Sequence, residues 1–238
     1  MKLIRLAFRR ETAMPVLALG LASGVCAALV LARIGWTGNL RYGSLAWNLF
    51  LAWLPLVFSL LAADEDQGCA KGSWRFLGFA SAWLLFFPNA PYIFTDVVHL
   101  TNNFYHQFWV DLVLVLLTAL TGLVLGFVSL FLMQAVVRRR LGDSASWVFI
   151  GAVAALSAFG VYLGRFLRFN SWDVIFQPLA LCRGIGNWAA HPLAHPTSYV
   201  FPALFATFLF VTYLMLYALT QLQATQTAVV PRLNPDRA

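Results

Sequence analysis

Two short segments carry most of the side chains that could do chemistry. The first, Phe87–Leu100, reads FPNAPYIFTDVVHL and contains Asn89, Tyr92, Asp96 and His99. On a helix, the spacing of Tyr92, Asp96 and His99 places their side chains on one face. A carboxylate and an imidazole on neighbouring turns can act as a general acid and base. We therefore take Asp96 and His99 as candidate catalytic residues, and Asn89 and Tyr92 as candidate substrate-binding residues.

The second segment, Gly164–Asp173, reads GRFLRFNSWD. Arg165 and Arg168 lie three residues apart, so a continuous helix would present them on adjacent turns of one face. Two guanidinium groups in that arrangement can form forked hydrogen bonds to a phosphate or a carboxylate. Asn170 and Asp173 follow directly, and we add all four residues to the candidate substrate-binding set.

Structural explanations exist for the same residues. The arginines could pair with Asp96, Asp111 or Asp173 and fix helix packing, or reach lipid phosphates with their long side chains. Tyr92 could belong to the belt of aromatic residues at a membrane surface. The pattern alone leaves these alternatives open.

A metal site has weaker support. Asp96 and His99 would supply two ligands, and a third would have to come from elsewhere in the chain. The other ionisable residues on the same predicted side are His106, Asp111, His191 and His195. Asp96 and His99 are therefore only weak metal candidates, we assign no metal, and no cofactor is predicted.

Composition identifies the class of protein that holds these residues. Of the 238 residues, 61% are hydrophobic and 11% are charged, against roughly 45–50% and 25% in soluble domains. A soluble fold or a disordered chain is excluded, because both need more polar surface. The net charge of +7 does not indicate nucleic acid, since the basic residues stand at the ends of apolar runs.

Uncharged stretches long enough to cross a bilayer number six, so we expect an all-α fold, a polytopic transmembrane helical bundle with six spans. The predicted spans are Thr12–Ala32, Tyr42–Ala63, Phe76–Thr95, Leu112–Val137, Ser144–Gly164 and about Tyr199–Leu222.

The third span should not be a regular helix. Pro88 and Pro91 each remove a backbone donor and disfavour helix at the residue before them. We predict that the span is kinked or broken at Pro88/Pro91, that Asn89 caps a second half-helix, and that its polar face follows. Farther along, Gly184–Ser198 is rich in Gly, Pro and His, which predicts a loop.

Lys and Arg residues set the predicted orientation. With the N-terminus inside, 11 of them fall on the inner side and 5 on the outer side, which favours two cytoplasmic termini. We expect a cytoplasmic (inner) membrane protein with a basic tail at 1–11, a membrane domain at 12–222 and a second cytoplasmic tail at 223–238. Spans three and five then end on the same outer face, where Asp111 is a candidate to join their polar residues.

The two segments together resemble a family of bacterial multi-pass membrane proteins described as a domain of unknown function 1361. The resemblance runs from about span two to span six, and it departs from the expected pattern at Phe169, where Trp is usual. It implies architecture and not activity. It adds weight to the following residues as the ones to test: Asn89, Asp96, His99, Arg165, Arg168, Asn170 and Asp173.

Three functions compete for this outer-facing polar site. The first is binding of, or chemistry on, a phosphate-bearing lipid headgroup or a lipid-linked glycan, with the arginines on the phosphate. The second is transport along the broken third span. The third is a structural role in which the polar clusters only lock helices together. Membrane lipids are the expected partners, and the sequence indicates neither a reaction nor an oligomeric state.

Overall fold

The computed structural model describes residues 13–68, 74–102, 108–190 and 197–229. These residues are helical apart from short connections, and they contain no strand. In chain order the helices are α2 (Ala13–Thr37), η1 (Leu40–Tyr42), α3 (Gly43–Gly68), α4 (Trp74–Phe86), α5 (Asn89–Tyr92), η2 (Ile93–Asn102), α6 (Phe108–Leu141), α7 (Asp143–Phe166), α8 (Asp173–Phe176), α9 (Pro178–Ala190) and α10 (Thr197–Val229).

Six helical stretches in the described part are long and apolar enough to cross a membrane, which confirms the predicted all-α bundle of six spans. They are Ala13–Thr37, Gly43–Gln67, Trp74–Val98, Phe108–Leu141, Asp143–Phe166 and Ser198–Gln221. Each overlaps one predicted span. The largest difference at the C-terminal end is that α10 continues to Val229, beyond Leu222, where we expected the membrane domain to end.

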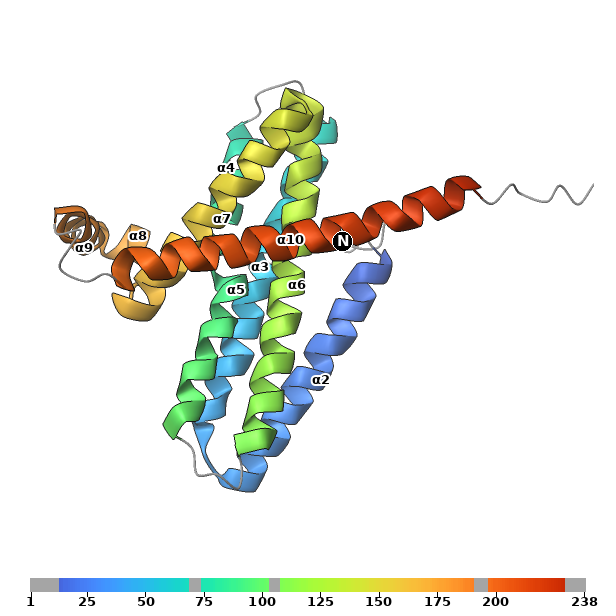
Figure 1. Cartoon of the computed structure of the whole chain (residues 1–238). Helices are drawn as coiled ribbons and strands as arrows, with labels where there is room; N and C mark the ends of the chain where they lie inside the picture. The colour runs from blue at the N-terminus through green and yellow to red at the C-terminus, as the bar shows by residue number, and fades with distance from the viewer. Residues whose placement is uncertain (1–12, 69–73, 103–107, 191–196, 230–238) are drawn as a thin grey trace, which may run out of the picture.

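Helices α3 and α6 form the centre of the molecule. In Figure 1, α3, α5 and α6 lie side by side, with α2 leaning against one side and α7 rising towards the other. Helix α10 crosses in front of α3 and α6 in this view. It packs antiparallel to α7, because Phe201 contacts Phe166 near one end of the pair and Tyr217 contacts Trp147 near the other.

Close packing around α5 depends on glycines from two neighbouring helices. A Cβ added at Gly122 of α6 would lie 3.0 Å from the Ala90 carbonyl oxygen, and one at Gly126 would lie 2.9 Å from Ala90 Cβ. On α7, a Cβ at Gly160 would lie 2.7 Å from Pro88 Cγ. Small residues let helix backbones approach closely in membrane proteins. The Pro-rich segment is therefore held between α6 and α7.

The third predicted span has three helical parts. Helix α4 ends at Phe86, Phe87 and Pro88 form a turn, and the one-turn helix α5 leads into the 3₁₀-helix η2. Asn89 does not cap α5, contrary to our expectation. Pro88 holds the cap position, and the Asn89 amide instead donates to the Phe86 carbonyl.

The predicted loop Gly184–Ser198 is partly wrong. Residues 184–190 belong to α9, Thr197 begins α10, and 191–196 lie outside the described residues. Gly184 lies in this helix close to a neighbour, since a Cβ there would lie 3.0 Å from the Phe169 ring. Composition predicted a loop at this glycine, whereas the structure has it in a packed helix.

Candidate functional site

The centre of the candidate site is an ion pair between the third and fifth spans. Arg165, in the last turn of α7, places Nη2 2.5 Å from Asp96 Oδ1. Both Nε and Nη2 of Arg165 also donate to Thr95 Oγ1, at 2.9 and 2.6 Å. The second carboxylate oxygen of Asp96 accepts from Asn48 Nδ2 at 2.9 Å. Three spans thus contribute to one cluster, which we call the polar cluster: Asn48, Thr95, Asp96 and Arg165.

Tyr92 and Asn89 extend the contacts of the polar cluster. The Arg165 guanidinium lies 4.7 Å from the centre of the Tyr92 ring, a cation–π arrangement. Asn89 Nδ2 donates to Ser171 Oγ at 3.0 Å, which ties α5 to the segment after α7. The structure therefore brings Asn89, Tyr92, Asp96 and Arg165 to one place.

A cavity of about 610 Å³ adjoins the polar cluster. Its polar lining includes Asn48, Asn89, Asp96, Arg165 and Ser171. Apolar and aromatic side chains form the rest of the wall, among them Trp47, Leu84, Leu156, Phe159, Phe169 and Leu181. A mostly apolar cavity with a few converging polar groups is the usual form of a small-molecule site.

Arg168 does not share a helical face with Arg165, contrary to the expected pair. Helix α7 ends at Phe166, and Arg168 has a φ of 61°, a left-handed conformation that is uncommon outside glycine. That turn carries the chain away from the helix axis. Arg168 is exposed and is not among the residues that line the cavity, so the two guanidinium groups do not form a common clamp.

Asn170 and Asp173 shape the segment that follows. The buried Asp173 carboxylate accepts a hydrogen bond from the Asn170 backbone N–H at 2.6 Å, and the Asp173 N–H donates to the Asn170 carbonyl at 3.0 Å. Asp173 thereby fixes a tight turn and does not line the cavity. The Asn170 residue does line it.

The predicted acid/base pair is described only in part. Asp96 is buried within the polar cluster, at 5% exposure. His99 belongs to η2, and the structure describes its backbone only. Tyr92 and Asp96, which we predicted to share a face, both contact Arg165 and line the cavity.

No group of three His, Cys, Asp or Glu side chains in the described part is arranged to hold a metal ion. His106, His191 and His195 lie outside the described residues. Of the residues considered for a metal, the structure describes the side chains of Asp96, which binds Arg165 and Asn48, and of Asp111, which binds Arg33 and Tyr42.

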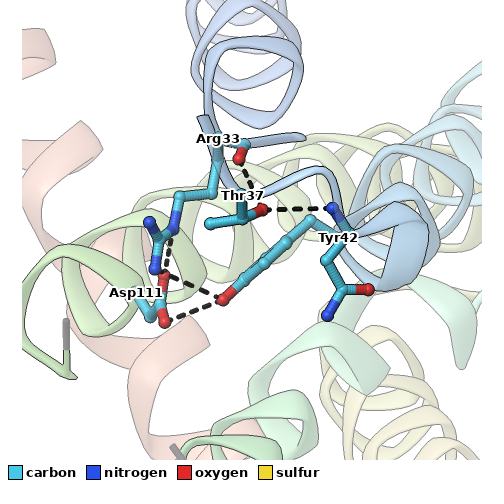
Figure 2. A network of polar contacts seen from close by, with 5 residues as sticks. Arg33, Thr37, Tyr42 and Asp111 are labelled. Carbon is cyan, nitrogen blue, oxygen red and sulfur yellow. Dashed lines mark hydrogen bonds and ion pairs between the residues drawn. The ribbon is translucent and has the colours of Figure 1, made fainter. Parts of the chain in front are cut away.

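A second arginine–carboxylate pair lies near the start of α6. Figure 2 shows Arg33 of α2 pointing to Asp111 of α6, with the Tyr42 hydroxyl between them. Arg33 Nε lies 2.6 Å from Asp111 Oδ1, and the Tyr42 hydroxyl donates to Asp111 Oδ2 at 2.8 Å. Asp111 therefore does not join the cavity, as we had expected it could, because α2 supplies its partner.

Burial raises the pKa of the Tyr42 hydroxyl, and the adjoining Asp111 carboxylate raises this pKa further. Arg33 acts in the opposite direction on the same group. The protonated hydroxyl is the form that can donate to Asp111, so the direction of the shift agrees with the hydrogen bond.

Three residues that make hydrogen bonds in the site were missed in the sequence: Asn48, Thr95 and Ser171. Asn48 is an amide inside the second apolar run, and an intramembrane polar residue of that kind is itself a signal of a site. Thr95 and Ser171 lie next to Asp96 and Asn170, and these neighbours drew attention instead. The pairing of Arg33 was also missed, because an arginine directly after a span is explained equally well as a flanking charge.

The helices and the cavity define a multi-span helical membrane protein. A comparison with family models matches residues 47–213 to the family described as Protein of unknown function (DUF1361). The chain belongs to this family, which confirms the resemblance and its extent from span two to span six. A search of curated proteins and a search of solved structures each found no match.

Proposed function

We propose that the protein binds an amphiphile, either a phosphate-bearing lipid or a lipid-linked glycan, with the polar end of the ligand in the cavity. The observation that carries this proposal is the division of the cavity lining. The polar cluster, Asn89 and Ser171 contribute one part of the wall, and leucines and aromatic rings contribute the other. A ligand with one polar and one apolar end satisfies both parts.

The position of the apolar wall supports entry of the ligand into the cavity from the bilayer. Leu84 and Leu156 line the cavity and are also exposed on the outside of the chain, at 37% and 53%. In a membrane, such surfaces face hydrocarbon. A hydrocarbon tail can therefore remain among the lipids while the headgroup reaches Asn48 and Arg165.

We further propose that the cavity faces outward and that both termini lie in the cytoplasm of a cell with an inner membrane. The excess of Lys and Arg on the proposed inner side, 11 against 5, supports this orientation. Arg33 and Arg165, two of the five basic residues on the proposed outer side, are each neutralised by an aspartate. At the other end, Arg139 and Arg140 share the single carboxylate of Asp66.

The prolines provide the geometry that this site needs. We propose that Pro88 and Pro91 break the third span, because each lacks the N–H that a continuous α-helix would use. Such a break gives Asn89 and Asp96 different orientations from those of one straight helix. It also lets Asn89 donate to both the Phe86 carbonyl and Ser171.

Asp96 is proposed to act as an acceptor for the ligand and to orient Arg165. An acid/base role for Asp96 with His99 stays a prediction. Binding is favoured over turnover because the Asp96 carboxylate already has two partners, Arg165 and Asn48.

A structural role is the second candidate, and one specific observation favours it. Arg165 contacts Thr95, Asp96 and Tyr92 at once, so its side chain alone makes three contacts that link the fifth span to the third. Under this alternative the cavity would be incidental to packing.

Lipid retention separates the two candidates. The full-length chain is purified in mild detergent from cell membranes, and bound lipids are measured by native mass spectrometry. We expect a bound lipid in the unmodified protein and its loss in Ser81→Phe, which narrows the cavity where Ser81 lines it. The matched control is Leu120→Phe, on an exposed position of α6 outside the cavity. Equal retention by both variants would leave the structural role as the better account.

A further inference from the structure

We infer that the polar end of the ligand is an uncharged, hydroxyl-rich group such as a sugar, and that a phosphate is not what the cavity contacts. This inference rests on the proposed function and selects between the two ligand classes that it allows.

The charges of the cavity balance without a ligand. Asp96 and Arg165 are the ionisable acid and base that line it, and they form an ion pair with each other. A phosphate entering this space would bring a negative charge beside the Asp96 carboxylate, in a setting with little water to screen the repulsion. A neutral group would not be repelled by the Asp96 carboxylate.

The second arginine does not change this balance. Phosphate sites built on arginine generally use forked hydrogen bonds from groups that converge on the anion. Arg168 is exposed, is turned away from α7 by its left-handed backbone, and does not line the cavity. The cavity therefore has no convergent pair of guanidinium groups.

The remaining lining suits hydroxyl groups and C–H surfaces. The amides of Asn48 and Asn170 and the hydroxyls of Ser81 and Ser171 each offer a donor and an acceptor. Asn89 offers its carbonyl oxygen, because its two N–H groups already donate to the Phe86 carbonyl and to Ser171. Rings from the same wall, including Trp47 and Phe159, provide flat apolar surfaces. A sugar ring presents hydroxyl groups at its edge and C–H groups on its face, so it can use both kinds of lining.

The size of the cavity agrees with such a headgroup. About 610 Å³ lies inside the range of roughly 300–1,000 Å³ that is typical of small-molecule sites. A site that hydrogen-bonds hydroxyl groups also discriminates strongly against ligands that lack them, because its own polar groups are then left unpaired. Diacylglycerol, which has one free hydroxyl, should therefore bind more weakly than a glycolipid.

The experiment compares defined lipids on the full-length protein after it has been stripped of native lipid in detergent. Native mass spectrometry measures the dissociation constants of monogalactosyldiacylglycerol, phosphatidic acid and diacylglycerol with identical acyl chains. Free methyl galactoside is the fourth probe, and it distinguishes a soluble sugar from a membrane-anchored one. We expect the galactolipid to bind at least about tenfold more tightly than the other three, equivalent to about 1.4 kcal/mol.

Substitutions at two neighbouring residues test whether the galactolipid binds in the cavity. Asn170→Ala removes an amide that lines the cavity, while Arg168→Ala removes an exposed cation two residues away that does not. Asn170 is exposed, and it takes part in its turn through its own backbone N–H and carbonyl groups. The folded state should therefore tolerate the change. The melting temperature of each variant checks this. Asn170→Ala should weaken galactolipid binding about tenfold, and Arg168→Ala should leave it unchanged.

The outcomes are distinguishable. Preferential binding of phosphatidic acid, weakened by Arg168→Ala, would overturn the inference and leave the proposed amphiphile site standing. Binding of methyl galactoside as tight as that of the galactolipid would support a sugar as the bound group. It would also show that the acyl chains add nothing to the affinity, which would overturn the proposed amphiphile. Failure of all four probes to bind would overturn both the inference and the proposed function.

Discussion

Two arginine–aspartate pairs in the described part of the chain have side chains that are no more than 15% exposed, and their surroundings differ. Arg33 and Asp111 have side chains that are 3% and 1% exposed, whereas Arg165 and Asp96 are 15% and 7% exposed. The first pair is closed over by Tyr42 and does not line the cavity (Figure 2). The second lines it. The same type of ion pair is thus closed off at Arg33 and Asp111, and accessible from the cavity at Arg165 and Asp96.

The difference indicates which pair is structural. A buried pair is weak evidence of net stabilisation, but removing one partner leaves an uncompensated charge at high cost. That cost should be greatest at the less exposed pair, Arg33 and Asp111. The polar cluster around Arg165 also lies wholly within the residues that match the family, 47–213, while Arg33 and Tyr42 lie outside them.

The largest expected effect is at the closed pair. Asp111→Asn leaves the Arg33 guanidinium buried without its counter-charge, and we expect a loss of about 3 kcal/mol in the free energy of unfolding. Denaturation of the purified protein in mixed micelles, followed by circular dichroism, measures this loss.

The control for that prediction removes both charges. Arg33→Met combined with Asp111→Leu eliminates the buried ions, and we expect it to be clearly more stable than Asp111→Asn. A double variant as unstable as the single one would mean that shape, and not charge, makes this contact important.

The matching substitution at the open pair should cost less. In Asp96→Asn the unpaired Arg165 is 15% exposed, against 3% for Arg33, so its charge is less fully removed from solvent and we expect a loss of about 2 kcal/mol. The same micelle denaturation compares it with Asp111→Asn. If the two losses are equal, the contrast between a closed and an open pair has no energetic basis.

The fold was largely predictable from the sequence, whereas the contacts of the site were predictable only in part: pairing of an arginine with Asp96 was one of the alternatives, and the contact of Asp96 with Asn48 was not foreseen. Six apolar runs are decided by local composition, which the bilayer enforces on each span separately. Which charged side chains pair depends instead on how close they lie in the folded chain. Asp111 was a candidate for the cavity, yet its partner Arg33 lies 78 residues earlier in the chain, and a single sequence gives no sign of such a pairing.

Predicted helical faces fared differently in the two segments. The face of Tyr92, Asp96 and His99 assumed 3.6 residues per turn; Ile93–Asn102 forms a 3₁₀-helix, yet Tyr92 and Asp96 still meet at Arg165. The face of Arg165 and Arg168 assumed a helix that in fact ends at Phe166. The prolines signalled irregular structure near Asn89, but nothing in the residue types signalled that Arg168 would adopt a left-handed backbone.

A third prediction concerns how the walls of the open site are held together. Gly160→Ala places a Cβ 2.7 Å from Pro88 Cγ, which forces α5 and α7 apart, and we expect a loss of about 1.5 kcal/mol. Gly151→Ala on the same helix is the control, because a Cβ there meets nothing within 4 Å. Equal stability of the two variants would show that the close approach at Pro88 does not hold the site. Lipid retention should fall in Gly160→Ala only.

The smallest expected effect on stability concerns Tyr42, beside the closed pair, and it depends on pH. Tyr42→Phe removes one hydrogen bond to Asp111, and we expect a loss of about 1 kcal/mol near pH 8. Folding raises the pKa of Tyr42 above its ordinary value of about 10, so the folded state favours the protonated hydroxyl. The stabilisation is therefore complete below about pH 10 and is lost as the pH rises through the folded-state pKa.

The difference in stability between the two proteins should consequently shrink above about pH 10, because the phenylalanine variant has no hydroxyl to ionise at this position. The six other tyrosines of the chain, which has seven in total, titrate in both proteins and cancel in the comparison. Denaturation curves at closely spaced pH values measure the difference. A difference that is constant through this range would mean that the Tyr42 proton is not coupled to folding, and that Arg33 alone determines the charge balance at Asp111.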